Sequence, residues 1–341
     1  MSQQCSVHHL GRGEEPGEKG VIMAKRMLDC VTSDFVTFKK EDWLSSISGS
    51  EGRVIACESI GTVLPMLGNI TNAEFTASMG ADILLLNIFD VQDPVIQGLP
   101  KVKPEDCVRE LKRLTGRMVG INLEPVEDNA GGEDPDNMWK MSPGRRATVE
   151  NAVKACEMGV DMILLTGNPG NGVSNGAITD TLRRLKAAVG DKVILAAGKM
   201  HASGIPSEAG EHIVTARDVE EFIGAGADIV LFPAPGTVPG ITMEYVRSLV
   251  KEAHSRGVLT MTSIGTSQEG ADTETIRQIA LMCKMAGTDI HHLGDSGYTG
   301  MALPENILAY SKAIRSQTCI PPDGVFSESI EILQKIVNEE N

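Results

Sequence analysis

Asp289-Ile-His-His-Leu-Gly-Asp-Ser-Gly-Tyr-Thr-Gly300 is the stretch that decides the fold of this chain. It follows Gly287-Thr288, so a Gly-x-Asp phrase opens a short, mostly apolar run. The same phrase occurs three times earlier, starting at Gly80, Gly159 and Gly226. Each glycine ends a helical pattern where a left-handed cap is needed, and each aspartate starts a run of strand length. Repetition at this long, nearly regular spacing indicates repeated steps from helix to strand.

Strand-like runs followed by helical patterns extend through most of the chain. The runs lie at residues 53–59, 82–89, 117–125, 161–166, 192–201, 228–232, 257–265 and 289–295. Eight alternating units over roughly 250 residues are typical of a (β/α)8 barrel, whereas a doubly wound sheet would need fewer repeats or a second domain. We therefore predict an α/β fold, a single (β/α)8 TIM barrel, with an N-terminal helix at residues 34–50 that caps its bottom.

The barrel is expected to occupy residues 23–320. Residues 1–22 are polar and glycine-rich and lack the apolar core of a signal peptide, so they are predicted to be a flexible N-terminal extension. Residues 321–341 are interpreted as a C-terminal linker and a surface helix. No apolar run approaches the length of a membrane span, so no membrane partner is expected.

Composition narrows the function classes. The chain of 341 residues carries 31 Lys and Arg against 46 Asp and Glu, a net charge of −15. Without a basic face to release phosphate counterions, nucleic-acid binding is not expected. The 7 cysteines are scattered singly, which argues against structural zinc and disulfides and fits a cytoplasmic protein. Both nucleotide fingerprints, Gly-x-Gly-x-x-Gly after the first strand and the P-loop, are missing.

Polar residues gather where the strand-like runs end. In a barrel these ends converge on one mouth, and alternate side chains of each strand point inward. Polarity at the ends therefore predicts which side chains share the interior. The predicted ring is Glu58, Asn87, Asn122, Glu124, Thr166, Asn168, Lys199, His201, His292 and Asp295, with Thr260 and Thr262 also inside. On the same parity His291 points toward the helices, and Cys57 fills space behind its strand.

Three of these residues suggest specific chemistry. Lys199, after two alanines and a glycine, could form a Schiff base with a carbonyl substrate. The alternatives are a buried ion pair with Glu58 or Glu124, or contact with a substrate phosphate. The two glutamates could form an acid and base pair, or bind Mg²⁺ or Mn²⁺ as a cofactor.

Glycine-rich turns follow the last two strand-like runs, as Gly265-Thr266-Ser267 and Gly294-Asp295-Ser296-Gly297. Many barrels bind phosphate at this position on backbone N–H groups. The turns therefore favour a phosphorylated or otherwise anionic ligand, although such glycines also make ordinary short turns. The acidic residues at 127–136 are interpreted as a solvated loop rather than a cation site.

Longer phrases resemble a known family. Gly80-Ala-Asp-Ile-Leu-Leu-Leu-Asn-Ile-Phe-Asp90, Asp93-Pro-Val-Ile-Gln-Gly-Leu-Pro100 and the stretch 292–307 resemble a family of uncharacterised bacterial TIM-barrel proteins, over most of residues 25–315. Members are often labelled haloacid-dehalogenase-like hydrolase or phosphoenolpyruvate phosphonomutase. The resemblance implies the barrel fold and leaves the reaction open. A dehalogenase-type hydrolase needs an Asp-x-Asp motif after its first strand, whereas the one here, Asp134-Pro-Asp136, sits in a polar loop. The paired Asp motif of phosphonomutases is absent.

We predict an enzyme that performs aldolase-like (lyase) or isomerase-like proton chemistry on a small anionic, phosphorylated or keto-acid metabolite. Lys199 would be the electrophile, Glu58 and Glu124 bases or metal ligands, and His292 and Asp295 an acid and its orienter. The predicted substrate-binding residues are Asn87, Asn122, Thr166, Asn168, His201, Gly265, Thr266, Ser267, Gly294, Ser296 and Gly297. The alternatives are a metal-dependent lyase or mutase, and a non-catalytic regulatory barrel that binds a sugar phosphate. The protein could also form a homo-oligomer.

Overall fold

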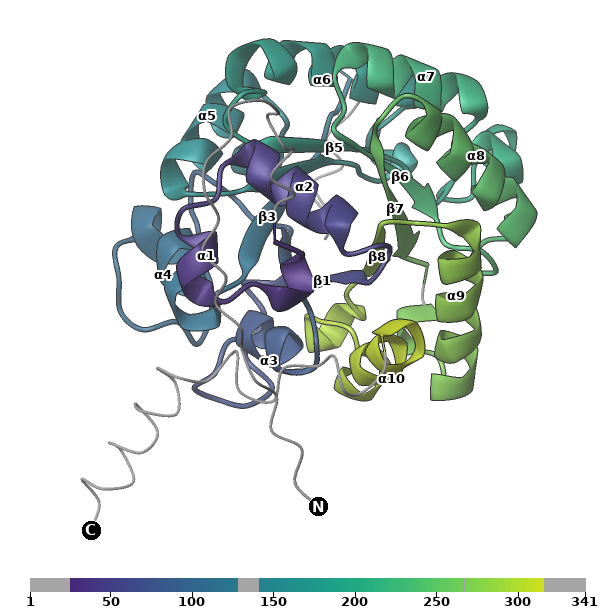
Figure 1. Ribbon diagram of the computed structural model, residues 1–341. Coiled ribbons are helices and arrows are strands. Elements are labelled where there is room, and N and C mark those ends of the chain that lie inside the picture. Colours follow the sequence, from purple (N-terminus) through teal and green to yellow (C-terminus); the bar gives the residue numbers. More distant parts are fainter. Residues whose placement is uncertain (1–24, 128–140, 267, 316–341) are drawn as a thin grey trace, which may run out of the picture.

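Eight parallel strands close into a barrel in the computed structural model, which describes residues 25–127, 141–266 and 268–315 (Figure 1). The strands are β1 (Val54–Ile60), β2 (Ile83–Asn87), β3 (Met118–Leu123), β4 (Met162–Leu165), β5 (Ile194–Gly198), β6 (Ile229–Pro233), β7 (Leu259–Ile264) and β8 (Ile290–Leu293). Each pairs with its neighbours in chain order, and β8 pairs with β1. The predicted (β/α)8 barrel is confirmed. The extensions predicted at residues 1–22 and 321–341 lie outside the described residues.

Helices surround the barrel and follow each strand. They are α3 (Asn72–Ser78), α4 (Cys107–Thr115), α5 (Val149–Met158), α6 (Asn175–Val189), α7 (Ala216–Ala225), α8 (Met243–Ser255), α9 (Thr273–Ala286) and α10 (Pro304–Arg315), and α1 (Thr32–Phe35) and α2 (Lys40–Gly49) precede β1. Thr71 caps α3 by accepting a hydrogen bond from Glu74 N at 3.0 Å. None of the described helices combines the length and apolar character that crossing a bilayer requires.

The four Gly-x-Asp phrases join a helix to the next strand. Their glycines, Gly80, Gly159, Gly226 and Gly287, have φ between 91° and 116°, a region that side chains rarely adopt. Asp161 then accepts a hydrogen bond from the backbone N–H of Val119 at 3.0 Å, at the start of the neighbouring β3. The other pairs are Asp82 with Ile55, Asp228 with Leu195, and Asp289 with Thr260, each at 2.8 Å. The phrase thus turns the chain and satisfies a donor at the beginning of the adjacent strand.

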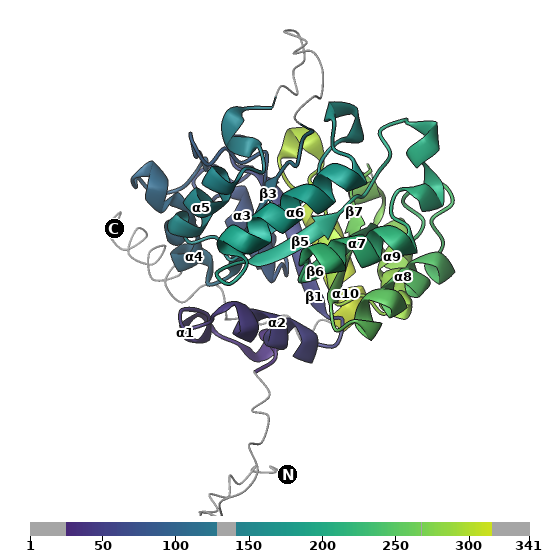
Figure 2. The same cartoon turned by 90° about the horizontal axis from the view of Figure 1, so that it is seen from above.

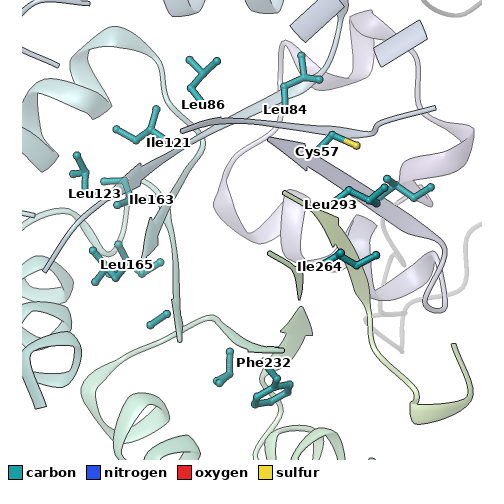
Figure 3. Packing of buried hydrophobic residues seen from close by; sticks show 14 of the residues in the cluster. Cys57, Leu84, Leu86, Ile121, Leu123, Ile163, Leu165, Phe232, Ile264 and Leu293 are labelled. Carbon is teal, nitrogen blue, oxygen red and sulfur yellow. The ribbon is translucent and has the colours of Figure 1, made fainter. Parts of the chain in front are cut away.

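Alternate side chains of the strands form two separate apolar layers. The outer layer packs against the helices and includes Cys57, Leu84 and Ile121 (Figure 3). His291 also points outward, because its Nδ1 lies 2.9 Å from the hydroxyl of Tyr310 on α10. The inner layer fills the barrel with residues such as Leu85. The outward positions predicted for Cys57 and His291 are confirmed.

Helix α2 covers the end of the barrel where the strands begin (Figure 2). Its Trp43 and Ile47 belong to the inner apolar cluster, together with Val54 at the start of β1. Lys40, at the first turn of the helix, forms an ion pair with Asp228 at 2.6 Å. The predicted N-terminal capping helix is therefore present, over residues 40–49.

The inward positions predicted for Thr260 and Thr262 are wrong. Register places Thr262 beside the outward His291 and Ser263 beside His292. The apolar Met261 belongs to the inner cluster, and Thr260 Oγ1 instead donates to Asp289 Oδ2 at 2.8 Å. Polarity misassigned this strand because the partner of Thr260, Asp289, is brought beside it only by folding.

Candidate functional site

A cavity of about 1070 Å³ opens where the strands end. This volume suits a small metabolite with bound water. Of the predicted site residues, the cavity is lined by Glu58, Asn87, Asn122, Glu124, Thr166, Asn168, His201, Gly265, Thr266, Asp295, Ser296 and Gly297. Lys199, His292 and Gly294 do not line it, and Ser267 lies outside the described residues. The roles assigned to these residues stay predictions, but most of their positions converge.

Two carboxyl groups meet at the β8–β1 side of this cavity. Glu58 is carried by β1, Asp295 follows β8, and the backbone N–H of Asp295 donates to Glu58 Oε2 at 3.2 Å. Burial, and next the negative charge of Glu58, together raise the pKa of Asp295 to about 6. A carboxyl group with such a pKa can both accept and release a proton near neutral pH.

Amide side chains hold Asp295 from the other side. Asn87 Nδ2 donates to Asp295 Oδ2 at 2.9 Å, and Asn122 Nδ2 donates to Asn87 Oδ1 at 3.3 Å. The backbone N–H of Gly297 donates to Asp295 Oδ1 at 2.9 Å. A chain of hydrogen bonds therefore runs from β3 through β2 to the carboxyl group, and it fixes the orientation of that group.

Ile88 stores backbone strain at the mouth. Its φ is 54°, which is unfavourable for a β-branched residue. The backbone N–H of Ile88 donates to Asn87 Oδ1 at 2.9 Å, and Ile88 itself lines the cavity. Strain of this kind gathers at functional sites, where the surrounding structure maintains it.

His292 lies behind Glu58, fully buried and away from the cavity. Its Nδ1 is 2.6 Å from Ser263 Oγ, and its Nε2 is 3.4 Å from Glu58 Oε1. The imidazole can therefore orient Glu58, but it does not reach a ligand in the cavity. This position departs from the predicted role of His292 as an acid that contacts substrate.

The inward orientation predicted for Lys199 is wrong. Register pairs Gly198 with the inward Leu231, so Lys199 takes the outward position and Met200 the inward one. Lys199 is 1% exposed and pairs with Glu208, in the 3-10 helix η5 (Pro206–Glu208). The ion pair weighed as an alternative exists, but with Glu208 and not with Glu58 or Glu124. The described side chain does not support Schiff-base chemistry, and that role stays a prediction.

Arg145 lines the cavity and was not singled out from the sequence. It ends the 3-10 helix η3 (Pro143–Arg145), and its guanidinium donates to Glu124 Oε1. Burial raises the pKa of Glu124, while the charge of Arg145 acts against this rise. The adjacent pair Arg145-Arg146 after an acidic loop was the only available signal, and it is weak.

His201 follows β5 and also reaches the cavity. Its Nδ1 lies 3.0 Å from Ser203 Oγ. Burial lowers its pKa, and the positive charge of Lys199 lowers it further. Both effects favour the neutral imidazole, which can donate a hydrogen bond to a ligand from its second nitrogen without adding charge.

The expected anion cradle at the β8 turn is not available. The N–H groups of the turn donate within the protein, Gly294 to Ile264 O at 2.7 Å, Asp295 to Glu58, Ser296 to Met301 O at 3.2 Å, and Gly297 to Asp295. The two carboxyl groups beside the turn would also repel an anion. At the β7 end, the hydroxyl of Thr266 donates to Thr237 O at 2.9 Å. The structure therefore contradicts the predicted cradle at the β8 turn, where two N–H groups donate to the carboxyl pair and two to backbone carbonyls, while anion binding at the β7 turn stays a prediction.

Metal binding by Glu58 and Glu124 stays a prediction. Within residues 25–127, 141–266 and 268–315, no group of three or more His, Cys, Asp and Glu side chains could hold a metal ion. Glu124 is engaged by Arg145, and Glu58 lies between Asp295 and His292. Both carboxyl groups are thus held by other side chains or backbone groups of the protein.

We expect Glu58→Gln to lower the pKa of Asp295 from about 6 toward its ordinary value of 3.8. The charge of Glu58 is one of the causes that raise this pKa, whereas burial, the larger cause, remains. The measurement is a carbon-13 NMR titration of the aspartate carboxyl groups, with the exposed Glu105→Gln as a control. An unchanged titration of Asp295 in the Glu58 variant would refute the coupling between the two groups.

Comparison with known proteins adds one curated relative. A Haemophilus influenzae protein, provisionally named as N-acetylmannosamine-6-phosphate 2-epimerase, is 35% identical over 89 residues. This match covers 26% of the chain and 33% of the relative, so the chain spans about a third of that protein's length.

Solved structures share the barrel. The carboxyl transferase domain of Rhizobium etli pyruvate carboxylase, solved with oxalate, superimposes with a TM-score of 0.50 and 12% identity, over 91% of this chain and 54% of that one. Thiamine phosphate pyrophosphorylase from Pyrococcus furiosus gives a TM-score of 0.44 and 12% identity, over 77% of this chain and 96% of that one. At this identity the likeness concerns the fold.

A family model covers nearly all of the barrel. It matches residues 28–319, a range that begins shortly before α1 and ends just after α10. The expected membership in a barrel family without an assigned activity is confirmed. The chain belongs to the family described as "Domain of unknown function (DUF7916)".

Proposed function

We propose that this protein is an enzyme of isomerase or lyase type, which moves a proton on a small anionic metabolite bound in the barrel mouth. The observation that carries the proposal is the carboxyl pair of Glu58 and Asp295 at the cavity, with the pKa of Asp295 raised to about 6. Perturbed carboxyl groups in a cavity are candidates for acid and base catalysis.

The proposed reaction starts with removal of a proton from the carbon next to a carbonyl group. The ionised carboxylate of the pair takes this proton, and the electron pair moves to the carbonyl oxygen as an enolate. Neutral His201 stabilises that oxygen with a hydrogen bond. Delivery of a proton to the same carbon from the opposite face, by the protonated partner of the pair, gives an epimer, and the base is left protonated until it exchanges with solvent. Return of the abstracted proton to the former carbonyl carbon, with the proton of the adjacent hydroxyl moving to the enolate oxygen, gives an isomer.

The relative named as a sugar-phosphate epimerase supports the choice of substrate class, although it shares only 89 matched residues. We therefore favour a phosphorylated sugar over a simple keto acid. The metal-dependent lyase or mutase and the non-catalytic regulatory barrel remain as alternatives, and the experiment below separates them.

The test is proton exchange with solvent. The protein is incubated in D₂O with hexose and N-acylhexosamine 6-phosphates and with keto acids, and proton NMR follows the carbon-bound hydrogen next to the carbonyl group. Loss of this signal, unchanged by EDTA, is the expected result. Loss that stops with EDTA and returns with Mg²⁺ would favour the metal-dependent alternative.

Binding without exchange would contradict the proposal. A thermal shift shows binding directly, because a ligand at about 100 times its Kd adds roughly 2.7 kcal/mol to the free energy of unfolding. A sugar phosphate that raises the Tm by several degrees and yet never exchanges its proton would indicate the regulatory barrel.

A further inference from the structure

Arg145 differs from the other charged residues at the cavity. Among the described residues that line it, Arg145 is the only lysine or arginine, and it lies in the same cavity as the carboxyl groups of Glu58, Glu124 and Asp295. Its side chain is 12% exposed, and its Nε is buried without a hydrogen-bond partner in the described structure. Burying a hydrogen-bond donor without an acceptor costs free energy, unless a bound ligand accepts the hydrogen bond.

The backbone around Arg145 is fixed against the end of β3. Glu124 N donates to Arg145 O at 2.9 Å, and Ala147 N donates to Glu124 O at 2.9 Å. Gly144 packs so closely on Asp90 that a Cβ at this position would overlap with the carboxylate. The guanidinium is therefore presented from a rigid segment, which reduces the entropy lost on binding a ligand.

Two further polar atoms without partners lie on the same side of the cavity. Thr166 is 2% exposed and Asn122 is 8% exposed, and both line the cavity. Within the described part of the chain, neither Thr166 Oγ1 nor Asn122 Oδ1 has a hydrogen-bond partner. Gly167, next to Thr166, lies close to Glu124, since a Cβ on this glycine would be 3.3 Å from Glu124 Oε2. These atoms and Arg145 thus gather around the ends of β3 and β4.

The three groups offer complementary chemistry. The guanidinium of Arg145 donates to an anion, and the hydroxyl of Thr166 can donate beside it. Asn122 Oδ1 is a carbonyl oxygen and so accepts a hydrogen bond, while the amide nitrogen of the same side chain donates to Asn87. An anion with a hydroxyl group nearby satisfies all three, whereas an anion without a hydroxyl leaves the Asn122 oxygen unpaired.

We propose that Arg145, Thr166 and Asn122 form the subsite for the anionic end of the substrate, which is a phosphorylated sugar or polyol. The inference rests on the proposed function for the other end of the molecule. The phosphate lies on the β3–β4 side, and the reacting carbon lies toward Glu58 and Asp295 on the β8–β1 side. This arrangement keeps the phosphate away from the carboxyl pair, and it does not use the β8 turn.

Calorimetric titration with inorganic phosphate and with glucose 6-phosphate tests the subsite by measuring binding. We expect Arg145→Gln to weaken the binding of both probes at least tenfold. The matched control is Arg146→Gln, which removes the same charge from the next, exposed residue and should change the Kd less than twofold. Thr166→Val should weaken phosphate binding several-fold.

Glu124→Gln separates recognition from folding. It removes the carboxylate that competes for Arg145, so phosphate should bind several-fold more tightly than to the wild type. The double variant with Glu124→Gln and Arg145→Gln leaves no unpaired charge behind, and it should bind phosphate as weakly as Arg145→Gln alone. A structural role of Arg145 predicts neither result.

Wild-type protein that binds neither probe, or equal affinities for the Arg145 and Arg146 variants, would overturn the subsite. Failure of the proposed function is distinguishable from this outcome. Phosphate binding that depends on Arg145 with no proton exchange would reject only the catalytic proposal. Exchange that survives Arg145→Gln with unchanged KM would reject only the subsite.

Discussion

The substitution Asp295→Asn should lower kcat/KM for the exchanging substrate by about 10³-fold, because acid and base catalysis by a positioned group contributes roughly 10²–10⁴-fold. The amide cannot take or give the proton, while Asn87 and Gly297 continue to hold the side chain near its place. The KM should change little, because phosphate is bound on the other side of the cavity. The measurement is initial-rate kinetics of exchange and turnover.

A matched control is Asp180→Asn on α6. Asp180 has a side chain that is 73% exposed and pairs with the exposed Arg183. This variant should keep wild-type rates. An Asp295 variant that retains more than about a tenth of the wild-type kcat would show that another group carries the proton, since acid and base catalysis would then contribute less than its usual range.

Asp295→Asn, which lowers activity, should raise the stability of the protein above pH 6. In the folded protein the pKa of Asp295 is about 6, above its ordinary value of 3.8, so between these values the folded state binds the proton more tightly than the unfolded chain. The free energy of unfolding therefore falls as pH rises from about 4 to 6 and is level above that range. Asparagine does not ionise and avoids this loss.

The gain of Asp295→Asn over wild type should be larger at pH 8 than at pH 4 by up to about 3 kcal/mol, since one pKa unit corresponds to about 1.4 kcal/mol. Urea denaturation at the two pH values measures it. The difference between the pH values cancels changes in hydrogen bonding that do not depend on ionisation. A pH-independent effect would contradict the raised pKa.

Loss of Arg315 should produce the largest destabilisation. Arg315 ends α10, is 5% exposed, and pairs with Asp82 at 2.6 Å. The same guanidinium donates to Gly80 O, which joins the last helix to the first α/β unit of the barrel. Removing one partner of a buried ion pair costs roughly 3–5 kcal/mol, because the other charge remains buried. Arg315→Met should lower the free energy of unfolding by about this amount.

Chemical denaturation checks this expectation, with Arg183→Met as the control for an exposed pair, worth at most about 1 kcal/mol. The double variant with Asp82→Asn should recover part of the loss, because no unpaired charge is left. A loss below about 1 kcal/mol in Arg315→Met would mean that the pair is solvated and does not fasten α10.

The sequence by itself determined the barrel and its mouth. Strand length, apolar periodicity and the Gly-x-Asp phrases are local properties, and they repeat because each βα unit solves the same packing problem. Polarity at strand ends located Glu58, Asn87 and Asp295, since a buried strand tolerates polar side chains mainly where it leaves the core. The N-terminal capping helix was also evident from its amphipathic pattern.

Only the tertiary structure decided which buried polar residues face the cavity. Lys199 and Thr260 point outward and are satisfied by Glu208 and Asp289, partners that the sequence does not reveal. Arg145 reaches the cavity because its segment pairs with the end of β3, which lies well before it in the sequence. The polarity of a residue shows that it needs a partner, but the partner's position depends on contacts between distant segments. The side of the strand on which each polar residue lies, and the groups that face a ligand, were therefore decided only by the tertiary structure.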